Sequence, residues 1–216
     1  MNIPRKLLPG LVVLALGLAA CSDGNRPQSE SVPARGAVVK GPIQGAQVQL
    51  FDLDEAGFGT GEALQTLTTD ETGRFTFSRP TGGPALLAVT RGGSFVDEAD
   101  PQTDPARKRR ITLDSEQGFE SILPAGATTL VVTPYTESLL LLARRAANGA
   151  NFPVFFAAVR ARAVETFGFD PFAVIPEPPL TPSPQASVES RRYALLLGGA
   201  ALSIQTQASA LGLVPT

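Results

Sequence analysis

Apolar and polar side chains alternate with a period of two between residues 36 and 132. The clearest case is the segment 46–50, where Ala, Val and Leu fall on one face of an extended chain and two Gln fall on the other. This alternation is typical of a half-buried strand. Further strands are expected at 38–39, 64–69, 74–78, 85–90, 111–113 and 128–133. Because these segments are short and separated by Gly-rich turns, they favour a small antiparallel β-sandwich.

Two turns indicate how the first strands pair. Gly41-Pro42 is expected to close a hairpin between the strand at 38–39 and the strand that follows it. Asp70–Gly73 is expected to close a second hairpin, with its glycine at a positive φ. Phe75 and Phe77 then point into the core.

From Thr133 onward the apolar period becomes that of an α-helix. Thr133 is a favourable N-cap, Pro134 suits the first helical position, and Asn148-Gly149 supplies the end. A second helix is expected over residues 152–167 and ends at Gly168. The predicted fold class is therefore α+β, an Ig-like or transthyretin-like sandwich followed by about three helices.

A third helix is expected over residues 187–211, after a connection at 174–186 that five prolines keep from being helical. Gly198-Gly199 in this helix is expected to let a neighbour approach closely. The apolar run 139–142 predicts that the first helix is buried on more than one side. The side chains expected to face inward in the three helices are Tyr135, Leu139, Leu142, Ala143, Ala146, Phe155, Phe156, Val159, Ala163, Phe167, Tyr193, Leu197, Ala200, Ile204, Ala208 and Leu211.

Residues 1–20 have the layout of a secretory signal. Arg5 and Lys6 precede the apolar run Leu7–Leu18, which is shorter than the roughly 20 residues that span a membrane. The run ends in Leu18, Ala19, Ala20 and Cys21, which resemble the lipobox of bacterial lipoproteins.

The lipobox resemblance implies that Cys21 becomes the mature N-terminus and carries acyl chains that anchor it in membrane lipid. Ser22 stands where lipoproteins kept at the inner membrane have Asp, which implies the outer membrane. An ordinary cleaved signal that leaves Cys21 as a free thiol is the alternative. Residues 21–35 contain almost no bulky apolar side chain and are expected to form a disordered tether, about 45–50 Å long when extended.

The amino-acid composition limits the classes of function that the chain can have. Removing residues 1–20 takes away two basic side chains and no acidic one, which leaves a net charge of −4. Such a chain has no basic field to attract nucleic acid. Cys21 is the only cysteine, so an intrachain disulfide is excluded, while 43% apolar residues are enough for a core.

Four segments carry a resemblance to a known family. They are 39–50 (VKGPIQGAQVQL), 69–75 (TDETGRF), 92–98 (GGSFVDE) and 132–137 (VTPYTE). The first two resemble the carboxypeptidase-regulatory-like, or transthyretin-like, sandwich, and the last two are similar to proteobacterial lipoproteins in which this sandwich leads into helices. The resemblance implies a sandwich domain at 36–132, a helical region at 133–216, and a non-catalytic accessory role.

Catalytic chemistry has few candidates here. The chain has no histidine, which is the commonest general base and neutral metal ligand. Outside the signal the only lysines are Lys40 and Lys108, and neither lies in a nucleophile motif. The acidic groups Asp52/Asp54/Glu55 and Asp97/Glu98/Asp100 are interpreted as solvated loop residues. We therefore expect no enzyme activity and no cofactor.

Two charged segments are candidate sites with weaker support than the lipobox. The loop 52–57 with Glu62 is rich in oxygen ligands and could wrap Ca²⁺, but Ala56 and Ala63 stand where an EF-hand needs ligands, so a solvated connection is favoured. The basic run Arg107–Arg110 could meet anionic lipopolysaccharide or phospholipid headgroups, although a solvated loop is again favoured.

Two functions of different class follow. The first is a lipid-anchored envelope module that binds a protein or glycan through sandwich loops such as 52–62 and 94–104, without catalysis. The second is a structural or assembly factor that docks another envelope protein through its helical region.

Overall fold

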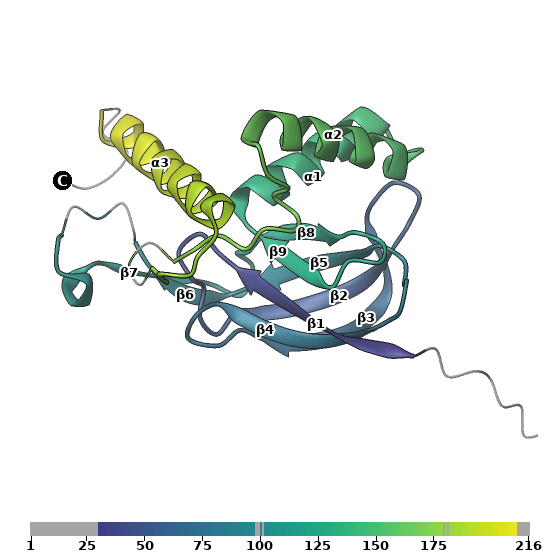
Figure 1. Cartoon of the computed structure of the whole chain (residues 1–216), viewed down its shortest axis with the longest axis horizontal. Helices are drawn as coiled ribbons and strands as arrows, with labels where there is room; N and C mark the ends of the chain where they lie inside the picture. The colour runs from purple at the N-terminus through teal and green to yellow at the C-terminus, as the bar shows by residue number, and fades with distance from the viewer. Residues whose placement is uncertain (1–29, 98–99, 101, 179, 181, 211–216) are drawn as a thin grey trace, which may run out of the picture.

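A computed structural model describes residues 30–210 of the chain, apart from residues 98–99, 101, 179 and 181. The expected signal sequence, the lipobox and the tether up to residue 29 lie outside the described residues. The described chain is α+β, with a β-sandwich followed by helices, which confirms the predicted fold class. Figure 1 shows the sandwich below and the helices above it.

Strands in the described residues form three sheets. They are β1 (Ser31–Val38), β2 (Gln47–Leu53), β3 (Gly59–Thr68), β4 (Arg74–Pro80), β5 (Leu86–Arg91), β6 (Gly93–Val96), β7 (Arg110–Leu113), β8 (Glu120–Leu123) and β9 (Thr129–Val132). One sheet has the order β4-β1-β9, the second has the order β3-β2-β5-β8, and β6 pairs with β7. The pair β1–β9 is parallel and the other pairs are antiparallel, so the sandwich is mixed rather than purely antiparallel.

The space between the two larger sheets holds the first core. Alternate residues of each strand point into it, as the period of two predicts. Val48 and Leu50 of β2 are fully buried there, and Phe75 and Phe77 of β4 are each 6% exposed. These inward positions were all predicted from the alternation.

The two predicted hairpins are wrong in their pairing, although both turns exist. β1 pairs with β4 and β9 rather than with β2, and the turn at Gly41-Pro42 carries the chain from one sheet to the other. The turn Asp70–Gly73 likewise joins β3 to β4, which belong to different sheets, and its glycine has a φ of 73°. Alternation reports which face of a strand is buried, but it does not report which strand is the neighbour.

The predicted tether is too long at its C-terminal end. β1 begins at Ser31 and pairs with β4 along residues 31–37, and the Thr81 N–H donates to the Glu30 carbonyl at 2.9 Å. The low apolar content concealed this strand, because Pro33 and Arg35 are exposed and β4 supplies the backbone partners.

Two strands, β6 and β8, were not predicted from the sequence. β6 begins at Gly93, where the sequence predicted only an end, because a φ of 90° at this residue turns the chain sharply into the β6–β7 hairpin. A Cβ at Gly93 would lie 2.8 Å from the Gln44 carbonyl oxygen, so the position requires glycine. β8 has no alternation, because Ser121, Ile122 and Leu123 are all buried in succession.

The helices begin and end close to the predicted residues. They are α1 (Pro134–Ala147), α2 (Phe152–Phe167) and α3 (Val188–Ala210). Thr133 caps α1 in a capping box with Thr136, and Asn148 and Gly168 end α1 and α2 in the left-handed conformation. The described part of the Pro-rich connection contains neither helix nor strand, as predicted.

The buried face of α1 differs from the predicted stripe. Its buried residues are Thr136, Leu140, Ala143 and Ala147. Leu142 is 54% exposed, and with the partly buried Leu139 it borders a groove between α1 and α2. The capping box buries the polar Thr136, because its hydroxyl bonds within the box, and this fixes a rotation that the apolar pattern alone did not indicate.

α3 is buried only in its first half. Tyr193 and Leu197 are buried as predicted, but Ile204 is 68% exposed, and a Cβ added at Gly198 or Gly199 meets no atom within 4 Å. The expected close neighbour at these glycines is therefore wrong. In Figure 1 the second half of α3 extends away from the sandwich and from α1 and α2.

Helices cover the outer faces of both larger sheets. Leu87 and Val89 of β5 and Ile122 of β8 form a second core with Leu140, Phe152, Phe156 and Phe172. A third core joins Ala37 and Val131 on the outer face of the β4-β1-β9 sheet to Phe169, Tyr193 and Leu197. Within the described residues, no helix is long and apolar enough to cross a membrane.

Candidate functional site

The predicted lipid-attachment residue Cys21 and the lipobox residues Leu18, Ala19 and Ala20 lie outside the described residues. Their role stays a prediction. The other candidates, which are the loop 52–62, the acidic group near Asp97 and the basic run Arg107–Arg110, can be placed.

The loop 52–62 connects β2 to β3 and contacts α1 and α2. Asp54 Oδ1 accepts hydrogen bonds from the N–H groups of Ala56 and Phe58, at 2.9 and 2.8 Å. The Gly57 carbonyl accepts from Arg144 of α1, and the Glu55 carbonyl accepts from the N–H of Phe152 in α2. The described residues contain no group of three His, Cys, Asp or Glu side chains arranged for a metal ion. The loop acts as a structural connection.

The β6–β7 hairpin contains both the second acidic group and the basic run. Asp97 is 8% exposed and its Oδ2 lies 2.5 Å from Arg109 Nη2. Asp100 accepts backbone hydrogen bonds from Gln102 and Arg109, and these bonds hold the pKa of its carboxyl group below the ordinary value.

The four basic side chains of the run have polar partners inside the same hairpin. Arg107 lies 3.7 Å from Asp104, Lys108 donates to the Asp100 carbonyl at 2.5 Å, and Arg110 donates to Ser94 at 3.2 Å. Arg107 and Arg109 are therefore paired with carboxylates, whereas Lys108 and Arg110 donate to uncharged oxygen atoms. Because two of the four charges are already paired, the geometry disfavours the run as a free cationic patch for lipid headgroups.

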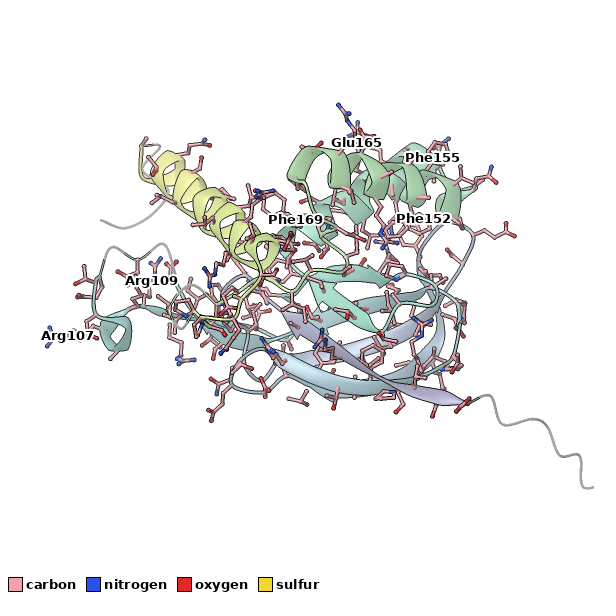
Figure 2. All side chains as sticks on the ribbon, viewed as in Figure 1. Arg107, Arg109, Phe152, Phe155, Glu165 and Phe169 are labelled. Carbon is pink, nitrogen blue, oxygen red and sulfur yellow. The ribbon has the colours of Figure 1, made fainter. Side chains whose placement is uncertain are left out.

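The two loops expected to form a binding surface lie at opposite ends of the sandwich. β2 runs antiparallel to β5 with Asp52 opposite Leu86, so the loop 52–62 is at the start of β5 and β6 follows the end of β5. Figure 2 shows Arg107 and Arg109 of the hairpin at one end of the molecule and Phe152 near the other. One ligand of ordinary size cannot contact both loops.

The two lysines outside the expected signal, Lys40 and Lys108, both contact other groups of the fold. Lys108 donates to a backbone carbonyl, and Lys40 Nζ lies 5.2 Å from the centre of the Phe95 ring. Tyr193 donates to, or accepts from, Thr133 at 2.6 Å inside the third core, and burial raises its pKa far above the ordinary value. These groups stabilise the fold.

One cavity lies between α2 and the four-stranded sheet. It has a volume of about 530 Å³ and is bordered by Leu53, Ile122, Phe152 and Phe156. Arg160 at its rim is paired with Asp170. The walls of the cavity are mostly apolar, and Asp54 and Glu55 border it together with Arg160.

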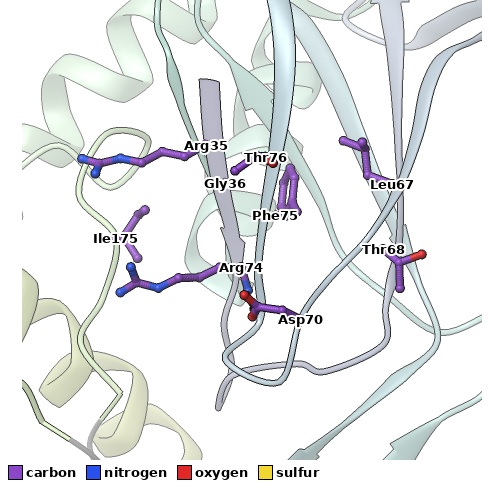
Figure 3. A pocket seen from close by; sticks show the side chains of 9 residues that line it. All are labelled: Arg35, Gly36, Leu67, Thr68, Asp70, Arg74, Phe75, Thr76 and Ile175. Carbon is purple, nitrogen blue, oxygen red and sulfur yellow. Dashed lines mark hydrogen bonds between the residues drawn. The ribbon is translucent and has the colours of Figure 1, made fainter. Parts of the chain in front are cut away.

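A second cavity, which we call the β4 edge cleft, lies where β3 and β4 diverge and has a volume of about 510 Å³. Arg35 of β1, Arg74 and Thr76 of β4, and Ile175 border it, and Phe75 and Leu67 form apolar walls. Figure 3 shows both arginine side chains extending in the same direction, towards Ile175. Both cations are exposed at its rim.

Among the described residues, Asp70 is the one acidic residue that borders the β4 edge cleft, and its carboxylate accepts hydrogen bonds within its own turn. Its Oδ1 accepts from the N–H and hydroxyl of Thr72 and from the N–H of Arg74, at 2.8, 2.7 and 2.9 Å. Burial acts to raise the pKa of Asp70, but these hydrogen bonds and the nearby charge of Arg74 outweigh it and hold that pKa below the ordinary value.

The β4 edge cleft was not predicted from the sequence. Arg35 falls in the expected tether, and Arg74 is the first residue of the expected strand 74–78. The alternation around Phe75 did indicate that Arg74 and Thr76 share the outer face, but the nearness of Arg35 depends on the β1–β4 pairing. Comparison of the chain with protein-family models, with curated proteins and with solved structures gave no match.

Proposed function

We propose that the protein is a lipid-anchored lipoprotein of the cell envelope whose sandwich is a non-catalytic binding module. The observation that carries this proposal is Leu18-Ala19-Ala20-Cys21 at the end of a short apolar run that follows Arg5 and Lys6. Ser22 after the cysteine favours the outer membrane. Two or more acyl chains on Cys21 would hold the protein where a single chain would not.

The position of β1 sets the reach of the anchor. Nine residues separate Cys21 from Ser31, so the sandwich begins at most about 35 Å from the acylated residue. The module would therefore act close to the membrane surface. Lys40, Lys108, Asp54, Asp97 and Asp100 are engaged in hydrogen bonds, an ion pair or a ring contact, which supports a binding role over catalysis.

Metabolic labelling with an alkyne-tagged fatty acid tests the anchor. In a Gram-negative host, the full-length protein should incorporate the label and fractionate with the outer membrane, because only acylated Cys21 can hold it there. Cys21→Ala should lose both the label and the outer-membrane location. Ser22→Asp is the matched control, since it should keep the label but move the protein to the inner membrane.

Label and outer-membrane location that persist unchanged in Cys21→Ala would refute the anchor. That result would place the lipid attachment at another residue, whereas an ordinary cleaved signal would leave even the unaltered protein without label.

A second function, docking of another envelope protein through the helical region, is favoured by apolar side chains exposed on the helices. Leu142 of α1 is 54% exposed, Leu195 of α3 is 77% exposed, and Leu202 and Ile204 are 56% and 68% exposed. A photo-crosslinking residue at position 202, with position 107 on the hairpin as control, should capture a resident envelope protein if this function holds. Equal capture from both positions would count against it.

A further inference from the structure

The outer face of the β4-β1-β9 sheet carries two positive charges side by side. Arg35 lies opposite Thr76 and Ala37 lies opposite Arg74 in the β1–β4 register, so the two arginines are diagonal neighbours on the same face. Like charges in this arrangement repel each other. Within the described residues, neither guanidinium group forms an ion pair or donates a side-chain hydrogen bond, and the nearby Asp70 is occupied by its own turn.

The backbone of β4 is open beside these charges. The Arg35 N–H donates to the Thr128 carbonyl at 3.0 Å, on the side of β1 away from β4. Arg35 and Thr76 are therefore a non-hydrogen-bonded pair, and the backbone N–H and carbonyl of Thr76 face the outer edge of the sheet.

Only part of this edge is occupied by other groups. Arg74 on the edge exchanges hydrogen bonds with Asp70, and the Ser78 carbonyl accepts from Gln65 Nε2 at 2.6 Å. Between them, no described residue bonds to the edge-facing groups of Thr76. β4 thus offers one open donor and one open acceptor at the β4 edge cleft.

An added strand would bring a side chain to the arginines. A peptide residue that exchanges both backbone hydrogen bonds with Thr76 lies directly opposite it, and opposite residues of a sheet project on the same face. That face carries Arg35 and Arg74. An acidic side chain at this peptide position would be a diagonal neighbour of Arg74 and would be attracted by Arg35 two strands away, while a basic one would be repelled.

We propose that the free edge of β4 binds an extended acidic peptide segment, which pairs with Thr76 and sets an Asp or Glu side chain beside Arg74, on the face that also carries Arg35. The segment adds a strand to the sheet, a common mode of peptide recognition. A second copy of this chain is disfavoured as the partner, because pairing two β4 edges would bring Arg74 of each copy to the same positive face.

The cleft fits the size of such a segment. Its volume of about 510 Å³ is within the range of ligand sites, and Ile175 and Phe75 supply apolar surface beside the charges. This inference rests on the proposed function, since it names the ligand class of the binding module. It does not depend on the acyl anchor.

Fluorescence anisotropy with a synthetic peptide tests the inference. The full-length protein in non-ionic detergent is titrated into labelled, end-blocked (Thr-Glu)4, whose alternation puts all carboxylates on one face of a strand. We expect binding in about 0.1 M salt, with (Thr-Gln)4 and (Thr-Lys)4 binding much more weakly. Arg35→Gln and Arg74→Gln should each weaken binding up to about fivefold, and Arg107→Gln on the hairpin should leave it unchanged.

Thr76→Pro separates strand addition from simple charge attraction. Proline is tolerated on an edge strand where its missing N–H faces outward, so the fold should persist, which circular dichroism checks. Binding of (Thr-Glu)4 should be lost in this variant. Unchanged binding in Thr76→Pro, or equal binding of polyphosphate with the same arginine dependence, would overturn the proposal in favour of a general anion surface.

Failure of this inference can be told from failure of the anchor. Cys21→Ala protein should bind (Thr-Glu)4 as tightly as the acylated protein. Absence of peptide binding by protein that is correctly acylated refutes the strand-addition site alone.

Discussion

Arg79 shows how a charged side chain can hold the interior together. It occupies an inward position of β4, in alternation with Phe75 and Phe77, and is 2% exposed. Its guanidinium group donates to four backbone carbonyls, those of Gly83, Pro84, Pro124 and Ala127, at 2.5, 2.8, 3.2 and 2.5 Å. Burial lowers the pKa of Arg79. One guanidinium group thus donates hydrogen bonds to both the β4–β5 connection and the β8–β9 connection, at the same edge of the sandwich.

Removing this guanidinium group should destabilise the protein strongly. Arg79→Met fills the space but leaves the Pro84 and Ala127 carbonyls without donors, while those of Gly83 and Pro124 keep only the backbone N–H groups of Gly126 and Ala127, so we expect the free energy of unfolding to fall by about 3 kcal/mol. Urea unfolding followed by circular dichroism measures the change. The matched control is Arg162→Met, whose side chain is 79% exposed, and its effect should stay within about 0.5 kcal/mol. Equal midpoints for the two variants would contradict the role of Arg79.

At the scale of the elements, Thr133 links three segments. Its hydroxyl accepts from the N–H of Thr136 at 3.1 Å and pairs with the hydroxyl of Tyr193 at 2.6 Å, so the N-terminus of α1 is tied to α3. Thr133 directly follows β9, which lies in the β4-β1-β9 sheet. The capping box therefore fixes the residue at which α1 begins, and the Thr133–Tyr193 hydrogen bond fixes where α3 packs.

Loss of the cap should affect both helices. Thr133→Ala removes the N-cap acceptor and the partner of a buried tyrosine hydroxyl, so we expect a loss of about 2 kcal/mol. Thr133→Ser keeps the hydroxyl and should cost far less. Thermal unfolding measures stability, and near-ultraviolet circular dichroism reports on the packing, because Tyr135 and Tyr193 are the only tyrosines and the chain has no tryptophan. An identical spectrum and stability for Thr133→Ala would refute the link.

The molecule as a whole depends on helices as covers for its sheets. α1 and α2 pack on the outer face of the four-stranded sheet, and the first half of α3 packs with the segment around Phe169 on the outer face of the three-stranded sheet (Figure 1). The boundary expected near residue 133 separates strands from helices, but the second and third cores both cross it. An apolar sheet face left in water would be costly.

Truncation tests this dependence. A chain that ends at residue 132 uncovers Leu87, Val89 and Ile122, so it should bind a hydrophobic dye and show no cooperative unfolding. A chain that ends at residue 187 uncovers only the smaller third core, and it should unfold cooperatively at a lower urea concentration than the full chain. Cooperative unfolding of the shorter chain at the full-length midpoint would show that the sandwich is independent.

The local features could be predicted from the sequence because they depend on near neighbours. The period of two identified the inward faces of β2 and β4, and the cap signals at Thr133 and Gly168 located helix ends within the residues that form them. A capping box or a glycine turn is completed by residues three or four positions away. Neither needs the rest of the fold.

Contacts between distant parts of the chain determine which elements pack together. The pairing of β1 with β4 and β9, the rotation of α1, and the open second half of α3 depend on contacts between residues far apart in the chain. The same reason hid the β4 edge cleft, because Arg35 and Arg74 are 39 positions apart in the sequence and become neighbours through the β1–β4 register. The alternation, the caps and the lipobox pattern at Cys21 can be recognised in the sequence because each is local, whereas strand neighbours are chosen by the free energy of the whole packed core.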